Sequence, residues 1–312
     1  MGNRLLDESA YQRILDSEDL ESALKVLGET VYSTWIADMK SGRDFDQAIE
    51  AELFHVYSEV EKFVPDKRLV EVCRLPYDFH NIKVLIKSHI LQKEGKDRRF
   101  NLLTPLGNIP KDDLIMAVES EDYRLLPYGL HAVLPKSLAL WEQTKDILEV
   151  EKDLDNQQYL LILRMVSETG IASAIAWGKA KVDAENLRNG VRLRRIGIDA
   201  SSAASYFHDG GFISREHLLS LLPEPLEGWA KLIGFADAGV LLGEMKELGD
   251  MNHVLVEMER LLDNYITGVL AKAKYGAFSE DNVMQYLWSK EMEAKNVRIL
   301  LVSVANNTNR EL

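Results

Sequence analysis

The stretch YDFHNIKVLIK, Tyr77 to Lys87, places Asn81 and Lys83 inside a run that otherwise has the pattern of a buried helix. Polar groups in such a place need a partner, because leaving them unpaired in a core costs free energy. The same arrangement returns as DAENLR (residues 183–188) and EAKNVR (residues 293–298). Each copy consists of an acid, two residues, Asn, an aliphatic residue and a base. The chain therefore carries one short signature three times.

The three signature asparagines are 105 and 110 residues apart, and other segments repeat at nearly the same interval. GNIPKDDL, Gly107–Leu114, resembles GFISREHL, Gly211–Leu218, which lies 104 residues further on. This interval is longer than that of the common short helical solenoids. We predict three copies of one helical unit, the third shortened at its end, NNTNREL. The expected boundaries are 1–104, 105–209 and 210–312.

The spacing of proline and of apolar residues predicts an all-α protein. Residues 136–222 and 226–312 contain no proline. Apolar residues recur every three or four positions in three long segments, each of which precedes one signature. We interpret these stripes as core or helix-hairpin seams. They are Ile49, Leu53, Val56, Val60 and Phe63; Ile147, Val150, Leu154, Leu161 and Met165; and Leu241, Met245, Leu248, Leu255, Met258, Leu262, Ile266 and Val269.

The acid and the base of each signature are five positions apart, about 140° around a helix, so they do not face one another. We expect each of them, and each signature asparagine, to find its partner on a neighbouring helix. The asparagines either fix helix packing or mark equivalent points of a pseudo-threefold assembly. We favour a structural role for the signature over direct contact with a ligand. Its residues are Asp78, Asn81 and Lys83; Asp183, Asn186 and Arg188; and Glu293, Asn296 and Arg298.

The charge and the cysteine content restrict the partners and the compartment. With 50 acids, 37 bases and a formal net charge of −13, the chain is poorly suited to nucleic acid or to a bare anionic membrane. A basic protein partner fits better. The single cysteine, Cys73, excludes an intramolecular disulfide and fits a reducing compartment. The N-terminal MGNRLLDESAY has no signal-peptide core, and no apolar run approaches the roughly 18 residues of a membrane span.

Motifs that would indicate catalysis are missing from the sequence. It contains no G-x-x-x-x-G-K-[ST], no G-x-S-x-G and no G-x-G-x-x-G. ELFH, Glu52–His55, has the Glu-x-x-His form of a di-iron site, but the nearest second copy, DMNH at 250–253, carries the wrong acid. We predict no catalytic residue, no cofactor and no metal.

The triple signature, together with PYDFHNIKVLIK and the closing EAKNVRILLV, closely resembles the C subunit of the prokaryotic V-type (A-type) ATPase/ATP synthase, a relative of the eukaryotic V-ATPase d subunit. The likeness covers essentially the whole chain. It implies three helical subdomains forming a funnel with pseudo-threefold symmetry, on the cytoplasmic face of the membrane. The funnel would sit on the membrane rotor ring and receive the foot of the central stalk, with no catalytic site of its own and no membrane span.

The C-terminus departs from the resemblance. Relatives usually continue with a glycine-containing turn and a terminal Ile-Arg-x-x-Leu-type helix, whereas this chain has VANNTNREL. We therefore expect a different final turn in the third unit, and a changed contact with the ring.

Two other functions remain open at this point. An all-helical scaffold or adaptor of another cytoplasmic complex would have the same pattern, and a helical metalloenzyme is a third possibility. For the rotor function, the excess of acids suggests an acidic socket for a basic stalk tip. The alternative is that the acids are spread evenly and serve solubility.

Overall fold

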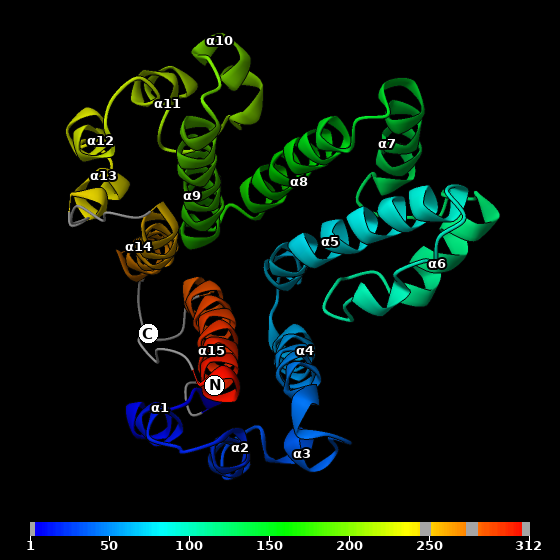
Figure 1. Ribbon diagram of the computed structural model, residues 1–312, viewed down its shortest axis with the longest axis vertical. Helices are drawn as coiled ribbons and strands as arrows, with labels where there is room; N and C mark the ends of the chain where they lie inside the picture. The colour runs from blue at the N-terminus through cyan, green and yellow to red at the C-terminus, as the bar shows by residue number, and fades with distance from the viewer. Residues whose placement is uncertain (1–3, 244–250, 273–279, 308–312) are drawn as a thin grey trace.

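The computed structural model of the protein describes residues 4–243, 251–272 and 280–307, and every regular element within these ranges is a helix (Figure 1). The all-α prediction is confirmed for this part of the chain. The α-helices are α1 Glu8–Leu15, α2 Leu20–Leu27, α3 Ser33–Ala37, α4 Phe45–Phe63, α5 Arg68–Lys93, α6 Lys111–Ser120, α7 Leu130–Thr144, α8 Ile147–Thr169, α9 Ala172–Ile196, α10 Ala200–Ala203, α11 Arg215–Leu221, α12 Leu226–Leu232, α13 Asp237–Leu242, α14 Met251–Lys272 and α15 Asp281–Asn306. Short 3₁₀ turns are η2 Gly42–Asp44, η3 Phe100–Leu102 and η4 Ala204–Tyr206.

Two of the three predicted apolar stripes lie on single long helices. The first is on α4, where all its members except Phe63, 70% exposed at the helix end, are buried. The second is on α8, which begins where the Asp146 carboxylate accepts a hydrogen bond from the Leu148 amide. The helix ends at Gly170, whose positive φ of 69° suits glycine. Capping at both ends explains why the helix stops there.

The third stripe does not lie on one helix but is divided between two. Leu241 belongs to the short helix α13, which ends one residue later, and the stripe resumes on α14. Gly243 stands at the end of α13, where its low helix propensity favours termination. Met245 and Leu248 lie outside the described residues, as does the C-terminal segment after Asn307 whose turn we expected to differ.

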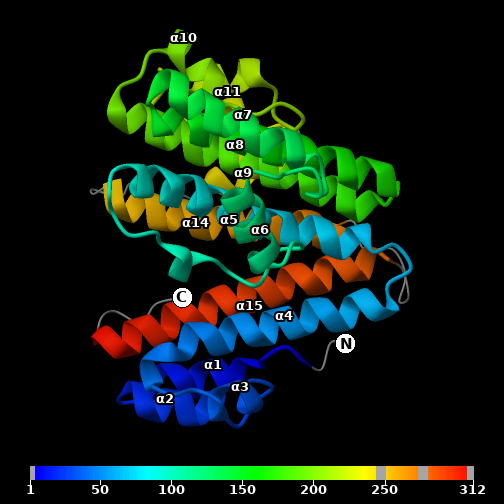
Figure 2. The same cartoon turned by 90° about the vertical axis from the view of Figure 1, so that its right-hand side faces the viewer.

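The three signature helices are α5, α9 and α15, and each packs against a long helix from a different part of the chain. Helix α5 packs on α8, α9 packs on α14, and α15 returns to pack on α4. Figure 2 shows this last pair lying side by side, although their sequences are more than 200 residues apart. Contacts between α4 and α5, α8 and α9, and α14 and α15 join the pairs. These six long helices of the described chain thus close into a ring of contacts.

The ring has a filled interior and a rim of short helices. Helix α15 also touches α5 and α9, so it contacts both of the other signature helices across the ring. Apolar residues from all of the long helices form one continuous core. The short helices α1–α3, α6 and α10–α13 lie around the outside (Figure 1). The signature residues therefore lie where the core meets the connections to this rim.

Two glycines allow connecting loops to pass close to the signature helices. Gly107 lies against the Asp78 carboxylate, and Gly211, 104 residues later, lies against the Asp183 carboxylate. A Cβ built on either glycine would overlap a carboxylate oxygen. The absence of a side chain is therefore required at both loops, for a steric reason.

We expect Gly211→Ala to lower the free energy of unfolding by about 1–3 kcal/mol, because the added methyl group forces the loop from the buried carboxylate. Gly268→Ala is the matched control, since nothing lies within 4 Å of its added Cβ. Near the C-terminal end of α14 this control should stabilise by up to roughly 0.5–1 kcal/mol. Urea denaturation of both variants measures the difference. Equal effects of the two substitutions would contradict the steric argument.

Candidate functional site

The acids of the first two signatures are buried and bind the loops that lead into the next short helix. Asp78 accepts hydrogen bonds from the Ile109 amide at 3.0 Å and from the Asn108 side chain at 2.8 Å. Asp183 accepts from the Ile213 amide at 3.0 Å and also from the amide of Phe212 and the hydroxyl of Tyr265. Each acid thereby fixes the entry to α6 or α11.

The asparagines of the same two signatures hold the earlier part of each loop by a pair of hydrogen bonds. Asn81 donates to the Thr104 carbonyl and accepts from the Thr104 amide, both at 2.9 Å. Asn186 makes the same pair with the backbone of His208, at 2.8 and 2.7 Å. Thr104 and His208 are 104 residues apart, as are Ile109 and Ile213. The two junctions are therefore built alike.

The acid of the third signature binds the first described residues of the chain. Glu293 accepts from the Leu6 amide at 2.6 Å and from the Tyr32 hydroxyl at 2.8 Å. Leu6 lies two residues before α1, just as Ile109 and Ile213 lie two residues before α6 and α11. The last signature helix thus holds the start of the chain in the same way.

The expectation that the acids and the asparagines bond to neighbouring helices is wrong, except for the bond of Asp183 to Tyr265 on α14. Asn81 and Asn186 bond to connecting loops, because a loop that enters the core needs side chains to satisfy its backbone groups. Asn296 also differs from the other two. Its side chain is half-buried and makes no hydrogen bond within the described residues.

The signature bases reach across to the neighbouring long helix, as expected. Lys83 pairs with Asp155 on α8 at 2.5 Å, and Arg188 pairs with Glu259 on α14 at 2.5 Å. Arg298 completes the set by pairing with Asp46 on α4. These pairs are partly exposed, so each contributes only about 0–1 kcal/mol. They orient the long helices more than they stabilise them.

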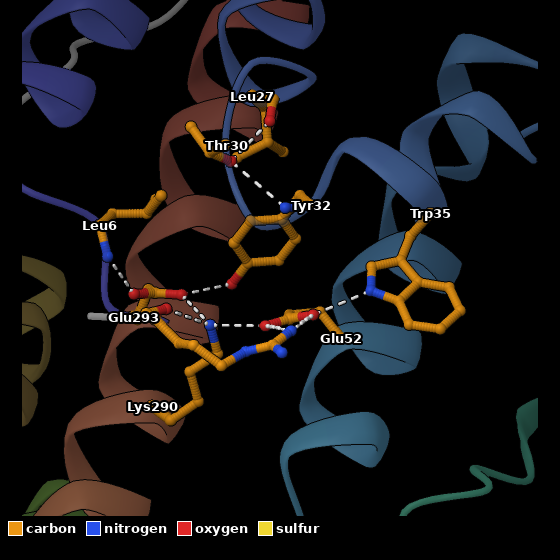
Figure 3. A network of polar contacts seen from close by, with 9 residues as sticks. Leu6, Leu27, Thr30, Tyr32, Trp35, Glu52, Lys290 and Glu293 are labelled. Atoms are coloured by element: carbon orange, nitrogen blue, oxygen red, sulfur yellow. Dashed lines mark hydrogen bonds and ion pairs between the residues drawn. The ribbon is translucent and has the colours of Figure 1, made fainter. Parts of the chain in front are cut away.

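A buried ionic cluster, defined here as Arg4, Glu52, Lys290 and Glu293, surrounds the third junction (Figure 3). The Lys290 ammonium lies 3.0 Å from Glu52 on α4 and 2.6 Å from Glu293, and none of its side chain is exposed. It also donates to the Arg4 carbonyl at 3.0 Å. Two cations and two anions balance one another; three of the charges are buried, while the Arg4 side chain is 41% exposed.

Two aromatic side chains complete the hydrogen bonding of the cluster. The Trp35 indole N–H donates to Glu52 at 2.9 Å, and the Tyr32 hydroxyl donates to Glu293. Figure 3 shows both rings pointing toward the carboxylates from the segment after α2. The cluster therefore ties together α15, α4 and residues 4–35.

Burial shifts the pKa values of the junction acids. Loss of water raises the pKa of Asp78, and it raises the pKa of Asp183 to about 6, although their hydrogen-bond donors oppose the shift. Burial and the nearby carboxylates also raise the pKa of Tyr32 and of Tyr265, so both hydroxyls stay protonated.

Sequence reasoning missed Thr104, His208 and Lys290. Lys290 did carry a signal, because it lies three residues before the signature acid, where the other two copies have Leu75 and Ala180. Leu75, Ala180 and Lys290 are all completely buried. A charge at a position that is apolar in the other copies indicates a buried ion pair. The loop residues had no such signal, since their contacts with Asn81 and Asn186 are made by the backbone.

The alternative metal site at Glu52–His55 has another explanation in the structure. Glu52 is engaged in the buried ionic cluster, and His55 lies against the Trp35 ring. Across residues 4–243, 251–272 and 280–307, no three His, Cys, Asp or Glu side chains gather as metal ligands would. No helix in the same ranges has the length and apolar character needed to cross a membrane.

Replacing Asn186 by Leu should lower the free energy of unfolding by about 1–3 kcal/mol, because the buried amide and carbonyl of His208 lose their partner. The same replacement at Asn296 is the control, since this asparagine makes no hydrogen bond within the described residues. We expect it to cost less than half as much in urea denaturation. A cost at Asn296 equal to that at Asn186 would contradict this assignment.

The raised pKa of Asp183 predicts a pH dependence of stability. An unfolded Asp loses its proton near pH 3.8, whereas buried Asp183 keeps it until about pH 6. Between these values the native state resists ionisation, so the free energy of unfolding should fall as pH rises, by up to about 3 kcal/mol. Asp183→Asn, which cannot titrate, is the reference. If the native protein instead gains stability relative to this variant between pH 4 and 6, the hydrogen bonds to Asp183 outweigh the effect of its burial, and the prediction is wrong.

Lys290→Met should cost about 3–5 kcal/mol of unfolding free energy, because it leaves Glu52 and Glu293 buried with too little positive charge. Lys295→Met, one and a half turns along α15, removes a partly exposed lysine that pairs with Asp263. This control should cost less than about 1 kcal/mol. Similar losses for both variants would show that the cluster adds nothing beyond a surface pair.

Comparison with known proteins places these features in a family. The family model described as ATP synthase (C/AC39) subunit matches residues 1–312. The C subunit of the A-type ATP synthase of Methanocaldococcus jannaschii is 24% identical, over 99% of this chain and 81% of the relative. The C subunit of the V-type sodium ATPase of Enterococcus hirae is 21% identical, over 98% and 92% respectively.

A third relative, the C subunit of the V-type ATP synthase of Thermus thermophilus, is 24% identical over 95% of this chain and 88% of its own length. The resemblance inferred from the triple signature is therefore confirmed by independent matches. Since the family model covers the whole sequence, the chain belongs to the ATP synthase (C/AC39) subunit family.

Proposed function

We propose that this protein is a non-catalytic subunit of a V-type or A-type rotary ATPase, where it couples the central stalk to the membrane rotor ring. The full-length family match carries the proposal, and relatives named as the C subunits of A-type and V-type enzymes support it. The protein would lie at the cytoplasmic face of the membrane and bind there through the complex. We disfavour a scaffold function in an unrelated complex, because the triple signature and the family model that matches the whole chain indicate the same family.

The proposed architecture is three units, near 1–104, 105–209 and 210–312, arranged as a funnel around a pseudo-threefold axis. The recurrence of the loop contacts at an interval of 104 residues supports this division. The return of α15 to α4 supports a closed arrangement. A closed ring suits a coupling role, since a load applied at one side is shared by every junction.

The decisive experiment is reconstitution with separately purified stalk subunits and rotor ring. If the protein couples the two, stalk and ring should co-purify only when it is present. A scaffold of another complex would retain neither. Mixing the protein with the stalk alone, and with the ring alone, shows whether each of the two contacts forms without the other.

We further propose that the stalk docks in an acidic concavity among the three units. The net charge of −13 supports this, because excess acids attract a stalk tip rich in Lys and Arg. Exposed charges are screened over about 8 Å at physiological salt. The affinity for stalk subunits should therefore fall at least about tenfold between 50 and 500 mM NaCl, measured by calorimetry. Affinity that stays flat with salt would exclude electrostatic docking.

A further inference from the structure

Helices α1 and α2 differ from the other short helices in how the chain joins them to the signature helix that holds them. At the first two junctions, the acid and the amide that it binds are 31 and 30 positions apart. At the third junction, Glu293 and the Leu6 amide are 287 positions apart. The first two contacts are therefore made within one connecting loop, whereas the third is made between distant parts of the chain.

The segment that precedes α4 has two parts, which are attached to different long helices. Helices α1 and α2 pack on each other and on α15, whereas α3 packs on α4 (Figure 1). The Trp35 indole of α3 donates to Glu52 on α4 at 2.9 Å, and its ring lies against His55 of the same helix. We call residues 4–27, which contain α1 and α2, the latch. Residues 28–32 connect the latch to α3.

The polar contacts that hold the latch come from the buried ionic cluster (Figure 3). Lys290 donates to the Arg4 carbonyl at 3.0 Å, and the Arg4 guanidinium lies 3.2 Å from Glu52. The Leu6 amide donates to Glu293 at 2.6 Å. When such charges separate they regain water, so a cluster of this kind opposes opening less than an apolar surface of the same size would. The latch is therefore held specifically but not strongly.

Buried apolar side chains make the latch one cooperative unit. Ile14 on α1 and Ala23 and Leu27 on α2 are 0% exposed. Each of the two helices has only eight residues. Helices shorter than about 12 residues are not stable alone in water. Once the latch leaves α15, both helices should therefore unfold together and not one residue at a time.

The ring of long helices keeps its own closing contacts when the latch leaves. Helices α15 and α4 pack directly on each other, and Lys290 pairs with Glu52 across this contact at 3.0 Å. Arg298 on α15 also pairs with Asp46 on α4. These contacts involve no residue of the latch. The ring can therefore stay closed while the latch is open.

Chain connectivity favours opening at the latch over opening at the other two junctions. The loops that carry Ile109 and Ile213 run from one helix of the folded protein to the next, so they stay near their acceptors when a hydrogen bond breaks. Leu6 lies 22 positions before Gly28, where the connection to α3 begins. An opened latch consequently gains more chain entropy than an opened loop does.

We propose that the latch opens from α15 and α4 as a unit while the six long helices stay folded as a ring, and that the ionic cluster holds it closed. The open form exposes Glu293 and the face of α15 that α1 and α2 cover, without unfolding the core. This opening is a property of the chain alone and does not rest on the proposed role in a rotary ATPase.

Hydrogen exchange resolved to single amides tests the proposal within one molecule, because the three signature acids bind three equivalent amides. After correction for intrinsic rates, the amides of Leu6, Ile14 and Leu27 should share one opening constant. It should exceed the constants of Ile109 and Ile213 by at least about thirtyfold. Equal protection of Leu6 and Ile213 would overturn the proposal. Fast exchange of Leu6 alone, with Ile14 as protected as Ile213, would also overturn it.

Asn186→Leu distinguishes opening of the latch from unfolding of the whole protein. This variant weakens the ring, so exchange of the Ile213 amide should rise at least about tenfold. Exchange of the Leu6 amide should stay within about twofold, because the ring is folded whether the latch is closed or open. If the two amides accelerate equally, the latch opens only by global unfolding, and the proposal is wrong.

Arg4→Met tests whether the ionic cluster holds the latch. It removes the ion pair with Glu52 and keeps the Arg4 carbonyl that Lys290 binds. Exchange of the latch amides should rise about threefold to tenfold. Arg124→Met is the matched control, because it removes an exposed ion pair with Asp122 in the loop after α6, and latch exchange should stay within about twofold. Equal latch exchange in the two variants would overturn the proposal.

Discussion

The fold depends on buried side chains that satisfy the backbone of loops entering the core. A chain that passes from a long central helix to a short outer helix must bring unpaired N–H and C=O groups into an apolar region, at a cost of roughly 1–3 kcal/mol each when unpaired. Asp78 and Asn81, and then Asp183 and Asn186, supply the missing partners. Because one carboxylate and one amide grip two points of each loop, they fix where the following helix begins.

The third junction solves the same problem with different chemistry. At the first two, a short Asp approaches a loop that has glycine at the point of contact. At the third, a longer Glu reaches the amide of Leu6, and Lys290 supplies a positive charge beside it. Removing water from several charges is expensive, so such a cluster is seldom used for stability alone. It does require one geometry, since each charge needs all of its partners in place.

Much of the fold could be read from the sequence, because helix periodicity and the absence of proline are properties of local segments. The stripes on α4 and α8 are of this kind, and the spacing of acid and base correctly indicated separate partners. The partners of Asn81 and Asn186 could not be read, because backbone groups of Thr104 and His208 do the bonding and any residue type supplies them. The break before α14 was missed since an apolar spacing can continue by chance across a turn.

The junction between Glu293 and Leu6 joins groups that are 287 positions apart in the chain. During synthesis the first residues leave the ribosome long before α15 exists, so Leu6 and Tyr32 must wait for their acceptor until the chain is almost finished. Contacts of such long separation form late and slowly, because much chain entropy is lost before they gain any energy. Segments α1 to α3 would therefore be the first made and the last to be secured, and the nascent protein would depend on its final helix to protect its beginning.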